Sequence, residues 1–224
     1  MTDPITIYKP LYIAIEGIDG TGKTTQVELL KEKFINDGIA VQTVREPGGT
    51  PFGESLREIM NKHVDVLDLA TLLAMYSARV QLHHEVITPA LKSDISIISD
   101  RSSLSSWAYQ YALSIHKDAI DFTDMKKLEI MLDKVRIRKP YTILLTTDKP
   151  EELGRIRNRG DVDMSNFDEK HSNSFKRIQK SMILHSSETS QIVDIINIDD
   201  KSIADVHGEI MEFVEDYIRK FLYS

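Results

Sequence analysis

Cysteine is absent from the 224 residues, so disulfide bonds and thiolate metal sites are excluded. Long apolar runs are absent too, because no uninterrupted stretch approaches the roughly 20 residues that a membrane-spanning helix needs. The N-terminal segment lacks the basic region followed by an apolar region that marks a signal peptide. These absences lead us to expect a soluble, cytoplasmic protein with no membrane partner.

A dense run of lysine or arginine is also missing, and the net charge is −7. Proteins that bind double-stranded nucleic acid usually present a basic face, so we expect no nucleic-acid partner. A small anionic ligand needs only a local positive pocket inside an acidic protein. Nucleotides therefore remain compatible with this composition.

The size of the chain points to one domain. Of its 224 residues, 41% are hydrophobic and 28% are charged. That is enough for one sizeable core, and a domain typically takes roughly 100–200 residues. We therefore expect residues 1–224 to form a single globular domain.

Short apolar runs alternate with segments of helical periodicity along the chain. Strands are expected at residues 11–15, 39–44, 95–99, 141–146 and 192–198. Helices are expected at residues 22–37, 54–61, 67–91, 102–114, 123–136, from Pro150 onward, 175–185 and 203–221, with loops at 45–51 and 158–174. This order predicts an α/β fold: a five-stranded parallel sheet with helices on both faces, whose ligands bind at the carboxyl ends of the strands.

The expected helix at residues 67–91 is apolar around much of its circumference. Such a helix is buried on more than one side. Two arrangements explain it equally well. One side packs on the sheet and another on a partner subunit, or neighbours from the same chain cover both sides.

Residues 17–24 match the phosphate-binding pattern G-x-x-x-x-G-K-[ST], between an apolar strand and an amphipathic helix. Glycines let backbone N–H groups turn toward the phosphates, and the helix N-terminus adds partial positive charge. We expect Lys23 to reach the β- and γ-phosphates of ATP and Thr24 to ligate Mg²⁺. The expected ATP-binding residues of this P-loop are Gly17, Ile18, Asp19, Gly20, Thr21, Gly22, Lys23, Thr24 and Thr25.

A P-loop alone does not reveal what is phosphorylated, because GTPases and ATP-driven regulators also carry it. A GTPase should show an N-K-x-D motif. Residues 61–64 begin as Asn-Lys but end in valine, which weakens that reading. A nucleotide-binding regulator that transfers no phosphate stays open as an alternative.

The third expected strand ends in Asp100-Arg101. A carboxylate at a strand end suits the neighbourhood of Mg²⁺ and the reacting oxygens. The guanidinium fork of an arginine beside it matches an anionic, phosphorylated acceptor. The plainer alternative is a structural ion pair at the edge of the sheet.

At this point the chain resembles the thymidylate kinase family over nearly its whole length. The stretches that carry the resemblance are IAIEGIDGTGKTTQ at 13–26, REPGGTP at 45–51, AR at 78–79, VITPAL at 86–91, DR at 100–101, SS at 105–106 and AYQ at 108–110. The resemblance implies a three-layer P-loop NTPase fold with a short lid at about residues 155–172. It also implies ATP and Mg²⁺ as cofactors, dTMP as the acceptor, and a homodimer.

The resemblance also places an acceptor site. Asp19 resembles the acid that reaches the sugar 3′-hydroxyl, and Arg57 and Arg101 resemble arginines that contact the acceptor phosphate. Arg79 resembles the arginine that binds thymine O4, and Tyr109 the ring that leaves no room for a 2′-hydroxyl. The full implied set is Asp19, Glu46, Pro47, Arg57, Met75, Arg79, Arg101, Ser105, Ser106, Tyr109 and Gln110. Taken singly, Arg57 could be a solvated helix residue and Tyr109 could be core packing.

Phosphoryl transfer asks mainly for positioning and for neutralisation of charge. We expect Lys23 and Arg101 to surround the phosphates and Asp100 to position Mg²⁺ or its water. Some family members carry a catalytic arginine in the P-loop where this chain has Gly20. Its substitute is then expected from the lid, where Arg155 aligns best as the catalytic residue, ahead of Arg157, and Arg159 is expected to bind ATP. A solvated helix face would explain these arginines as well.

The departures from the family pattern cluster around the base pocket and the lid. Met75 stands where phenylalanine usually stacks on thymine, and Ser102 stands where tyrosine often follows the DR pair. Methionine packs on a ring with less shape definition. We therefore hypothesise that dUMP is accepted alongside dTMP. A kinase of broader or shifted deoxynucleotide specificity remains an alternative to a strict dTMP kinase.

Overall fold

The computed structural model describes residues 9–63, 66–113, 120–150, 153, 174–190 and 192–221. Its centre is a five-stranded sheet in the order β2-β3-β1-β4-β5, and every adjacent pair is parallel. The strands are β1 (Tyr12–Gly17), β2 (Val41–Arg45), β3 (Ser96–Asp100), β4 (Tyr141–Thr146) and β5 (Ile192–Asn197). The predicted parallel α/β sheet is confirmed, and all five strands lie where their apolar runs placed them.

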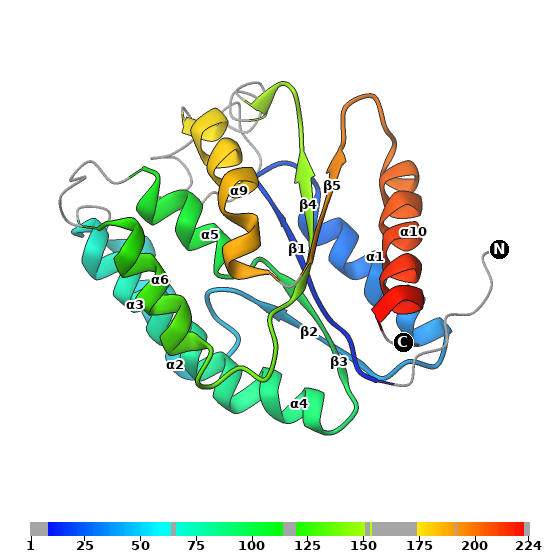
Figure 1. Ribbon diagram of the computed structural model, residues 1–224, viewed down its shortest axis with the longest axis horizontal. Coiled ribbons are helices and arrows are strands. Elements are labelled where there is room, and N and C mark those ends of the chain that lie inside the picture. Colours follow the sequence, from blue (N-terminus) through cyan, green and yellow to red (C-terminus); the bar gives the residue numbers. More distant parts are fainter. Residues whose placement is uncertain are drawn as a thin grey trace.

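Helices cover both faces of the sheet (Figure 1). Their bounds are α1 (Lys23–Asn36), α2 (Pro51–Lys62), α3 (Asp68–Leu82), α4 (Thr88–Lys92), α5 (Leu104–Ser106), α6 (Phe122–Leu132), α9 (Phe175–Thr189) and α10 (Ile203–Phe221). The chain also has two π-helical turns in its described part: η1 (His83–Ile87) follows α3, and η2 (Trp107–Tyr111) follows α5. No helix in the described part of the chain is long and apolar enough to cross a membrane.

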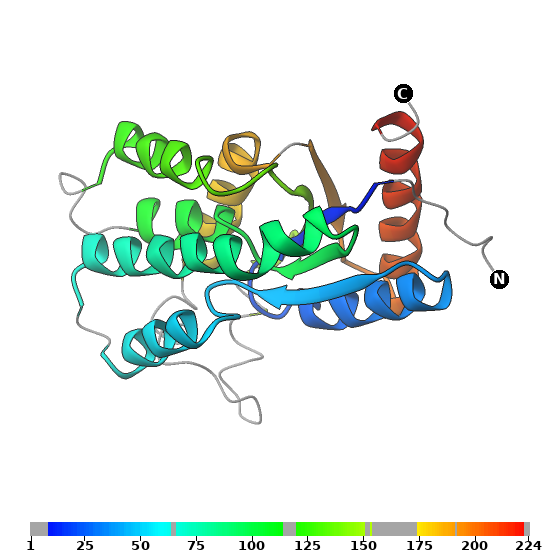
Figure 2. The same ribbon diagram turned by 90° about the horizontal axis from the view of Figure 1, so that it is seen from below.

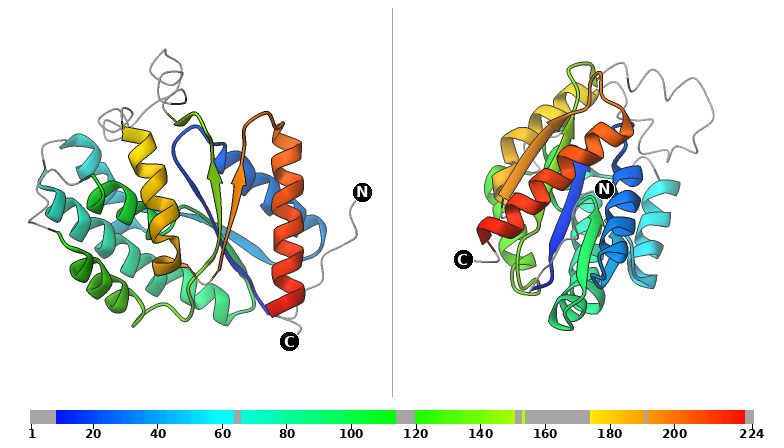
Figure 3. Two further views of the ribbon diagram at one scale, coloured as in Figure 1. Left: turned by 45° about the horizontal axis from the view of Figure 1, so that its top comes forward. Right: turned by 90° about the vertical axis from the view of Figure 1, so that its right-hand side faces the viewer.

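Separate apolar clusters form the two outer layers. On one face α1 and α10 pack on the sheet through residues such as Phe34 and Ile210. On the other face α3, η2, α6 and α9 gather around Trp107, whose side chain is fully buried. Figure 3 shows the sheet between these helical layers, as the three-layer prediction required.

The expected long helix at residues 67–91 is a run of three parts, α3, η1 and α4, which Figure 2 shows as one long rod. Leu72, Tyr76 and Leu82 are buried by neighbours of the same chain, whereas Leu73 remains 49% exposed. The chain's own elements thus cover much of the helix. The described residues leave one side of the helix open, which is compatible with a partner subunit there.

Several predicted boundaries were wrong, and one of them is the end of the helix expected at 123–136, because α6 ends at Leu132. α2 begins at Pro51 rather than at residue 54, because the Thr50 hydroxyl accepts a hydrogen bond from Gly53 N–H at 3.0 Å and caps the helix. The helix expected at 102–114 is only the short α5 with the wider turn η2, and α9 extends to Thr189. The helix expected from Pro150 is described only at Pro150 and Leu153. The predicted lid at 155–172 lies outside the described residues.

The carboxyl ends of β1, β2 and β3 meet at one edge of the sheet. Asp100 pairs in register with Ile15 of β1 and with Arg45 of β2. The polar segments that follow these three strands are therefore neighbours in space, although they are far apart in the sequence. This edge carries the candidate site.

Candidate active site

The P-loop begins at the end of β1 and continues into the first residues of α1. Gly17 and Gly22 both have positive φ, 149° and 85° respectively, which favours glycine. A Cβ atom on Gly17 would lie 2.6 Å from the backbone oxygen of Leu145 and 2.7 Å from Thr21 Oγ1. The loop therefore needs glycine at this position for space as well as for backbone conformation.

Lys23 is buried within the curve of this loop, with 6% of its surface exposed. Its Nζ donates to the backbone oxygen of Ile18 at 2.9 Å and lies 3.4 Å from Asp19 Oδ1. Burial lowers the pKa of Lys23 to about 8, and the nearby Arg101 guanidinium adds to this effect. An anionic phosphate in the loop would add to the counter-charge that Asp19 already supplies to this buried ammonium group.

Thr24 and Asp100 meet at the edge of the loop. Thr24 Oγ1 donates to Asp100 Oδ2 at 2.8 Å, which joins the first turn of α1 to the end of β3. These two hard oxygen ligands fit Mg²⁺, which usually binds one or two protein oxygens together with water and substrate phosphates. Among the described residues no cluster of three or more His, Cys, Asp or Glu side chains could hold a metal ion. A small Mg²⁺ site of this kind fits the donors that are present.

Arg101 follows Asp100 in an unusual backbone conformation. Its φ of 79° is rare for a residue with a side chain and costs about 1–2 kcal/mol. Its N–H donates to Ile15 O at 3.1 Å, and its carbonyl oxygen accepts from Ser99 Oγ at 2.7 Å. The guanidinium pairs with Asp19 and donates to Ser105 Oγ at 3.1 Å. The backbone thus turns Arg101 toward the P-loop.

Asp19 is the carboxylate that joins the P-loop lysine to the arginine after β3. It pairs with both Lys23 and Arg101, and Tyr109 Oη donates to its Oδ2 at 3.5 Å. The Arg101 guanidinium also lies 5.5 Å from the centre of the Tyr109 ring. The structure therefore brings together the P-loop lysine, the arginine after β3 and the aromatic ring on η2.

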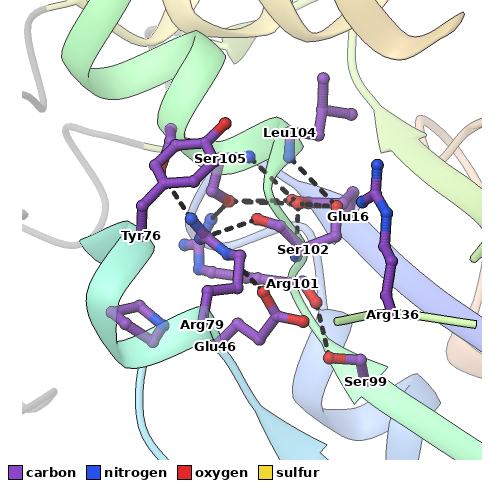
Figure 4. Close-up of polar contacts among 12 residues, drawn as sticks. Glu16, Glu46, Tyr76, Arg79, Ser99, Arg101, Ser102, Leu104, Ser105 and Arg136 are labelled. Carbon is purple, nitrogen blue, oxygen red and sulfur yellow. Dashed lines mark hydrogen bonds and ion pairs between the residues drawn. The ribbon is translucent and has the colours of Figure 1, made fainter. Parts of the chain in front are cut away.

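A second, fully buried arginine lies deeper in the site. Arg79 is only 1% exposed and pairs through Nε with Glu46. Its Nη1 donates to Ser106 Oγ at 3.0 Å, and its Nη2 donates to the carbonyl oxygen of Ser102 at 3.1 Å. Burial raises the pKa of Glu46, while Arg79 acts against that shift. Figure 4 shows Arg79 and Arg101 joined to the same serine-containing segment.

The sequence model of the thymidylate kinase family matches residues 15–210 of this chain. The chain belongs to the thymidylate kinase family. It is similar to a thymidylate kinase from Idiomarina loihiensis, with 35% identity over 210 residues that cover 92% of this chain and 98% of the relative. A thymidylate kinase from Thermosipho africanus is 34% identical over 213 residues, which cover 93% of this chain and all of the relative.

The fold agrees with a solved member of the thymidylate kinase family. The crystal structure of thymidylate kinase from Ehrlichia chaffeensis superposes with a TM-score of 0.70 at 26% identity, covering 92% of this chain and 99% of that one. The family resemblance and the fold class expected from the motifs are both confirmed. The chain is accordingly a kinase of this family.

The remaining predicted residues lie on the P-loop, α2, α3 and η2, apart from two arginines outside the described part of the chain. Arg57 on α2 donates from Nη1 to the carbonyl oxygen of Pro47 at 3.1 Å, which ties α2 to the REPGG loop. Met75 is half-buried on α3, one helical turn before Arg79. Gln110 is buried on η2. Gly20, Thr24 and Thr25 are exposed, whereas Ile18 and Thr21 are buried in the loop, and the predicted Arg155 and Arg159 lie outside the described residues.

Glu16 is a site residue that the sequence reasoning missed. This fully buried acid lies in β1 directly before Gly17 and accepts hydrogen bonds from Ser102 and Ser105 (Figure 4). Ser105 therefore has two partners in the site, Glu16 and Arg101. One signal could have revealed it, namely an acid inside an otherwise apolar strand, because a buried charge requires partners.

Proposed function

We propose that this member of the thymidylate kinase family transfers the γ-phosphoryl group of ATP to dTMP, giving dTDP and ADP for dTTP synthesis. The observation that carries the proposal is the meeting of Lys23 and Arg101 at Asp19. Lys23 belongs to the loop that suits the donor phosphates, and Arg101 follows the strand end that suits an acceptor phosphate. A site for transfer between two anions requires such cations on both sides.

On the donor side, the backbone N–H groups of the P-loop and the N-terminus of α1 hold the phosphates of ATP. Lys23 neutralises the β- and γ-phosphates. Thr24 and Asp100, whose oxygens are hydrogen-bonded to each other, would hold Mg²⁺. When bound, Mg²⁺ supplies charge neutralisation at the phosphate oxygens.

On the acceptor side, Arg101 and Arg57 bind the phosphate of dTMP, and Asp19 accepts a hydrogen bond from the sugar 3′-hydroxyl. Tyr109 lies against the deoxyribose and leaves no room for a 2′-hydroxyl. Arg79 donates to the base and is held ready for this by Glu46 and Ser106. The other proposed contacts of the acceptor are Pro47, Met75, Ser105 and Gln110.

In the reaction, an oxygen of the dTMP phosphate attacks the γ-phosphorus of ATP. A new P–O bond forms, the bond from the γ-phosphorus to the β–γ bridging oxygen breaks, and ADP leaves with that electron pair. The attacking oxygen is already anionic at neutral pH, so no strong general base is needed. Lys23 and Arg101 neutralise the charge, and we propose Arg155 as the further catalytic cation, with Arg159 on ATP.

An acceptor panel tests this proposal. ADP release is measured with dTMP, dUMP, the other deoxynucleoside monophosphates and UMP, with Lys23→Ala as the control. We expect rapid release with dTMP and none with the variant. Comparable turnover of several deoxynucleotides would favour a broader kinase, and ATP binding without any acceptor-dependent release would favour a regulator.

We also propose that the chain acts as a homodimer. α3 and α6 pack against each other and carry apolar side chains that the described residues leave exposed, namely Leu73 at 49%, Ile130 at 60% and Met131 at 55%. Light scattering should give the mass of two chains, and Leu73→Lys should lower it. Ile35→Lys is the matched control, because Ile35 is 57% exposed on α1, on the opposite face of the sheet.

Two further proposals concern the whole chain. We propose that residues 1–224 act as one domain with its lid at about 155–172, since strands from Tyr12 to Asn197 belong to one sheet. We propose a cytoplasmic location, where ATP and nucleoside monophosphates are available. Limited proteolysis and cell fractionation, respectively, test these two statements.

A further inference from the structure

Glu16 is the last residue of β1 before the P-loop glycine, and its side chain is fully buried. Of the described residues, no cation lies within ion-pair distance of its carboxylate. Neutral donors hold it instead. Oε1 accepts from Ser102 N–H at 2.7 Å, from Ser102 Oγ at 2.9 Å and from Ser105 N–H at 3.2 Å, and Oε2 accepts from Ser105 Oγ at 3.0 Å.

The segment that Glu16 holds is the segment that holds both acceptor-side arginines. The carbonyl oxygen of Ser102 accepts from Arg79 Nη2 at 3.1 Å. Ser105 Oγ accepts from Arg101 Nη1 at 3.1 Å while it donates to Glu16. One carboxylate therefore fixes, through two serines, the positions of two guanidinium groups that come from α3 and from the end of β3 (Figure 4).

The backbone of Arg101 adds an independent reason for such a support. Its positive φ of 79° persists only where the surroundings determine it. Ile15 and Ser99 hold its own N–H and carbonyl groups. The very next residue, Ser102, is anchored to Glu16 through both its N–H and its hydroxyl group. Glu16 thus closes the turn in which the strained residue lies.

We propose that Glu16 is a positioning residue for the acceptor site, acting on Arg101 through Ser105 and on Arg79 through Ser102. This inference rests on the acceptor-side roles proposed above for the two arginines. Serine donors hold the buried charge without consuming a guanidinium, so Arg101 keeps N–H groups for a phosphate. Glu16 itself touches neither substrate nor metal in this arrangement.

The proposal predicts a selective kinetic defect. Glu16→Ala should raise the KM for dTMP roughly tenfold to a hundredfold, because the turn loses its charged acceptor, and should leave the KM for ATP within twofold. Glu16→Gln keeps an oxygen that accepts from Ser102, and its new amide N–H can donate to Ser105 Oγ in place of the bond that Ser105 donates to Glu16, so it should restore most of the affinity. Ser102→Ala should fall between wild type and Glu16→Ala.

Tyr141→Phe serves as the matched control. This variant also removes a hydrogen bond of a buried side chain, the 2.7 Å bond from Tyr141 Oη to Asp194. That bond joins β4 to β5, away from the acceptor site. It should lower the melting temperature without changing either KM. If Glu16→Ala behaves like this control, or if it raises the two KM values equally, Glu16 is only a structural residue and the proposal is wrong.

Two further arms keep the result decisive. If Glu16→Ala does not fold, Ser102→Ala and Glu16→Gln carry the test, and an unchanged KM for dTMP in Ser102→Ala overturns the proposal. Arg101→Ala and Arg79→Ala are measured in parallel. If they leave dTMP kinetics unchanged, the proposed acceptor site fails. If they impair it but Glu16→Ala does not, only the role of Glu16 fails.

Discussion

Thr24 Oγ1 donates a hydrogen bond to Asp100 Oδ2 at 2.8 Å, and this contact joins the P-loop helix to the end of the third strand. The two oxygens belong to residues 76 positions apart in the sequence. In the proposed function these two oxygens would hold Mg²⁺ at this edge of the sheet.

Asp100→Asn should weaken the use of Mg²⁺. The amide keeps the size of the side chain and removes the charge, so half-maximal activity should require roughly 10- to 100-fold more Mg²⁺. Activity of both proteins should disappear with excess EDTA. Asp216→Asn, an exposed change on α10, is the control. An identical Mg²⁺ titration for wild type and Asp100→Asn would contradict the metal role.

Lys23 should give kcat/KM for ATP a decline as pH rises through about 8. Burial lowers its pKa to that value in the free protein, so the cation is lost above it. The profile of kcat should decline at higher pH, because bound phosphates favour the charged lysine. Lys23→Arg should not show this decline of kcat/KM, because a guanidinium group stays protonated across this pH range. A flat kcat/KM profile from pH 7 to 9.5 would refute this assignment.

The same lowered pKa makes a prediction about stability. Between pH 8 and 10.5 the unfolded chain holds a proton on Lys23 that the folded chain has released. The contribution of this group to the free energy of unfolding should therefore rise with pH across that window. Denaturant titrations of wild type and Lys23→Met at several pH values isolate the contribution, and an equal pH dependence of the two proteins would count against it.

Glu129→Ala should destabilise the fold by about 3–5 kcal/mol, because it removes the buried one of the two carboxylates that pair with Arg136 and leaves the Tyr76 and Trp107 donors without their acceptor. Glu129 accepts from Tyr76 and Trp107 and pairs with Arg136 at 3.0 Å, with only 3% of its surface exposed. Urea unfolding provides the measurement. Glu58→Ala, in an exposed pair on α2, should not change the unfolding midpoint measurably. Equal midpoints for the two variants would disprove the difference.

Met75 should allow dUMP as an acceptor. A methionine on the half-buried face of α3 defines the base pocket less sharply than an aromatic ring. The ratio of kcat/KM for dTMP over dUMP should stay within about tenfold, the scale of one methyl group in an apolar pocket. Met75→Phe should raise it. A much larger kcat/KM for dTMP than for dUMP in the wild type would contradict the hypothesis.

Tyr109 should exclude ribonucleotides. Its buried ring lies beside Arg101, and its hydroxyl reaches Asp19, the proposed partner of the sugar. UMP should be a poor acceptor relative to dUMP, and Tyr109→Ala should narrow that gap. Tyr109→Phe keeps the ring and should keep the discrimination. An unchanged ratio in Tyr109→Ala would show that another group performs the exclusion.

Local chemistry explains why so much could be predicted from the sequence. Apolar runs ending in glycine or in Asp100 mark buried strands, and the pattern at residues 17–24 requires a strand before it and a helix after it. Both signals depend on neighbouring residues only. The five strands, the P-loop and the family could therefore be predicted from the sequence.

Other features depend on packing between distant segments. The wide turns η1 and η2 interrupt patterns that read as plain helix, and α2 begins at Pro51 because Thr50 caps it. The strand order β2-β3-β1-β4-β5 reflects which strands pack together, and no single run contains that information.

The sequence alone determined a P-loop kinase of the thymidylate kinase family, because its motifs are short and their chemistry is local. Only the tertiary structure decided that Glu16, one residue beyond the apolar run expected at 11–15, accepts from Ser102, 86 residues away. A buried carboxylate must find donors, but periodicity does not say which ones. The fold supplies them by placing the ends of β1 and β3 side by side, where one acid is linked through two serines to both arginines of the proposed acceptor site.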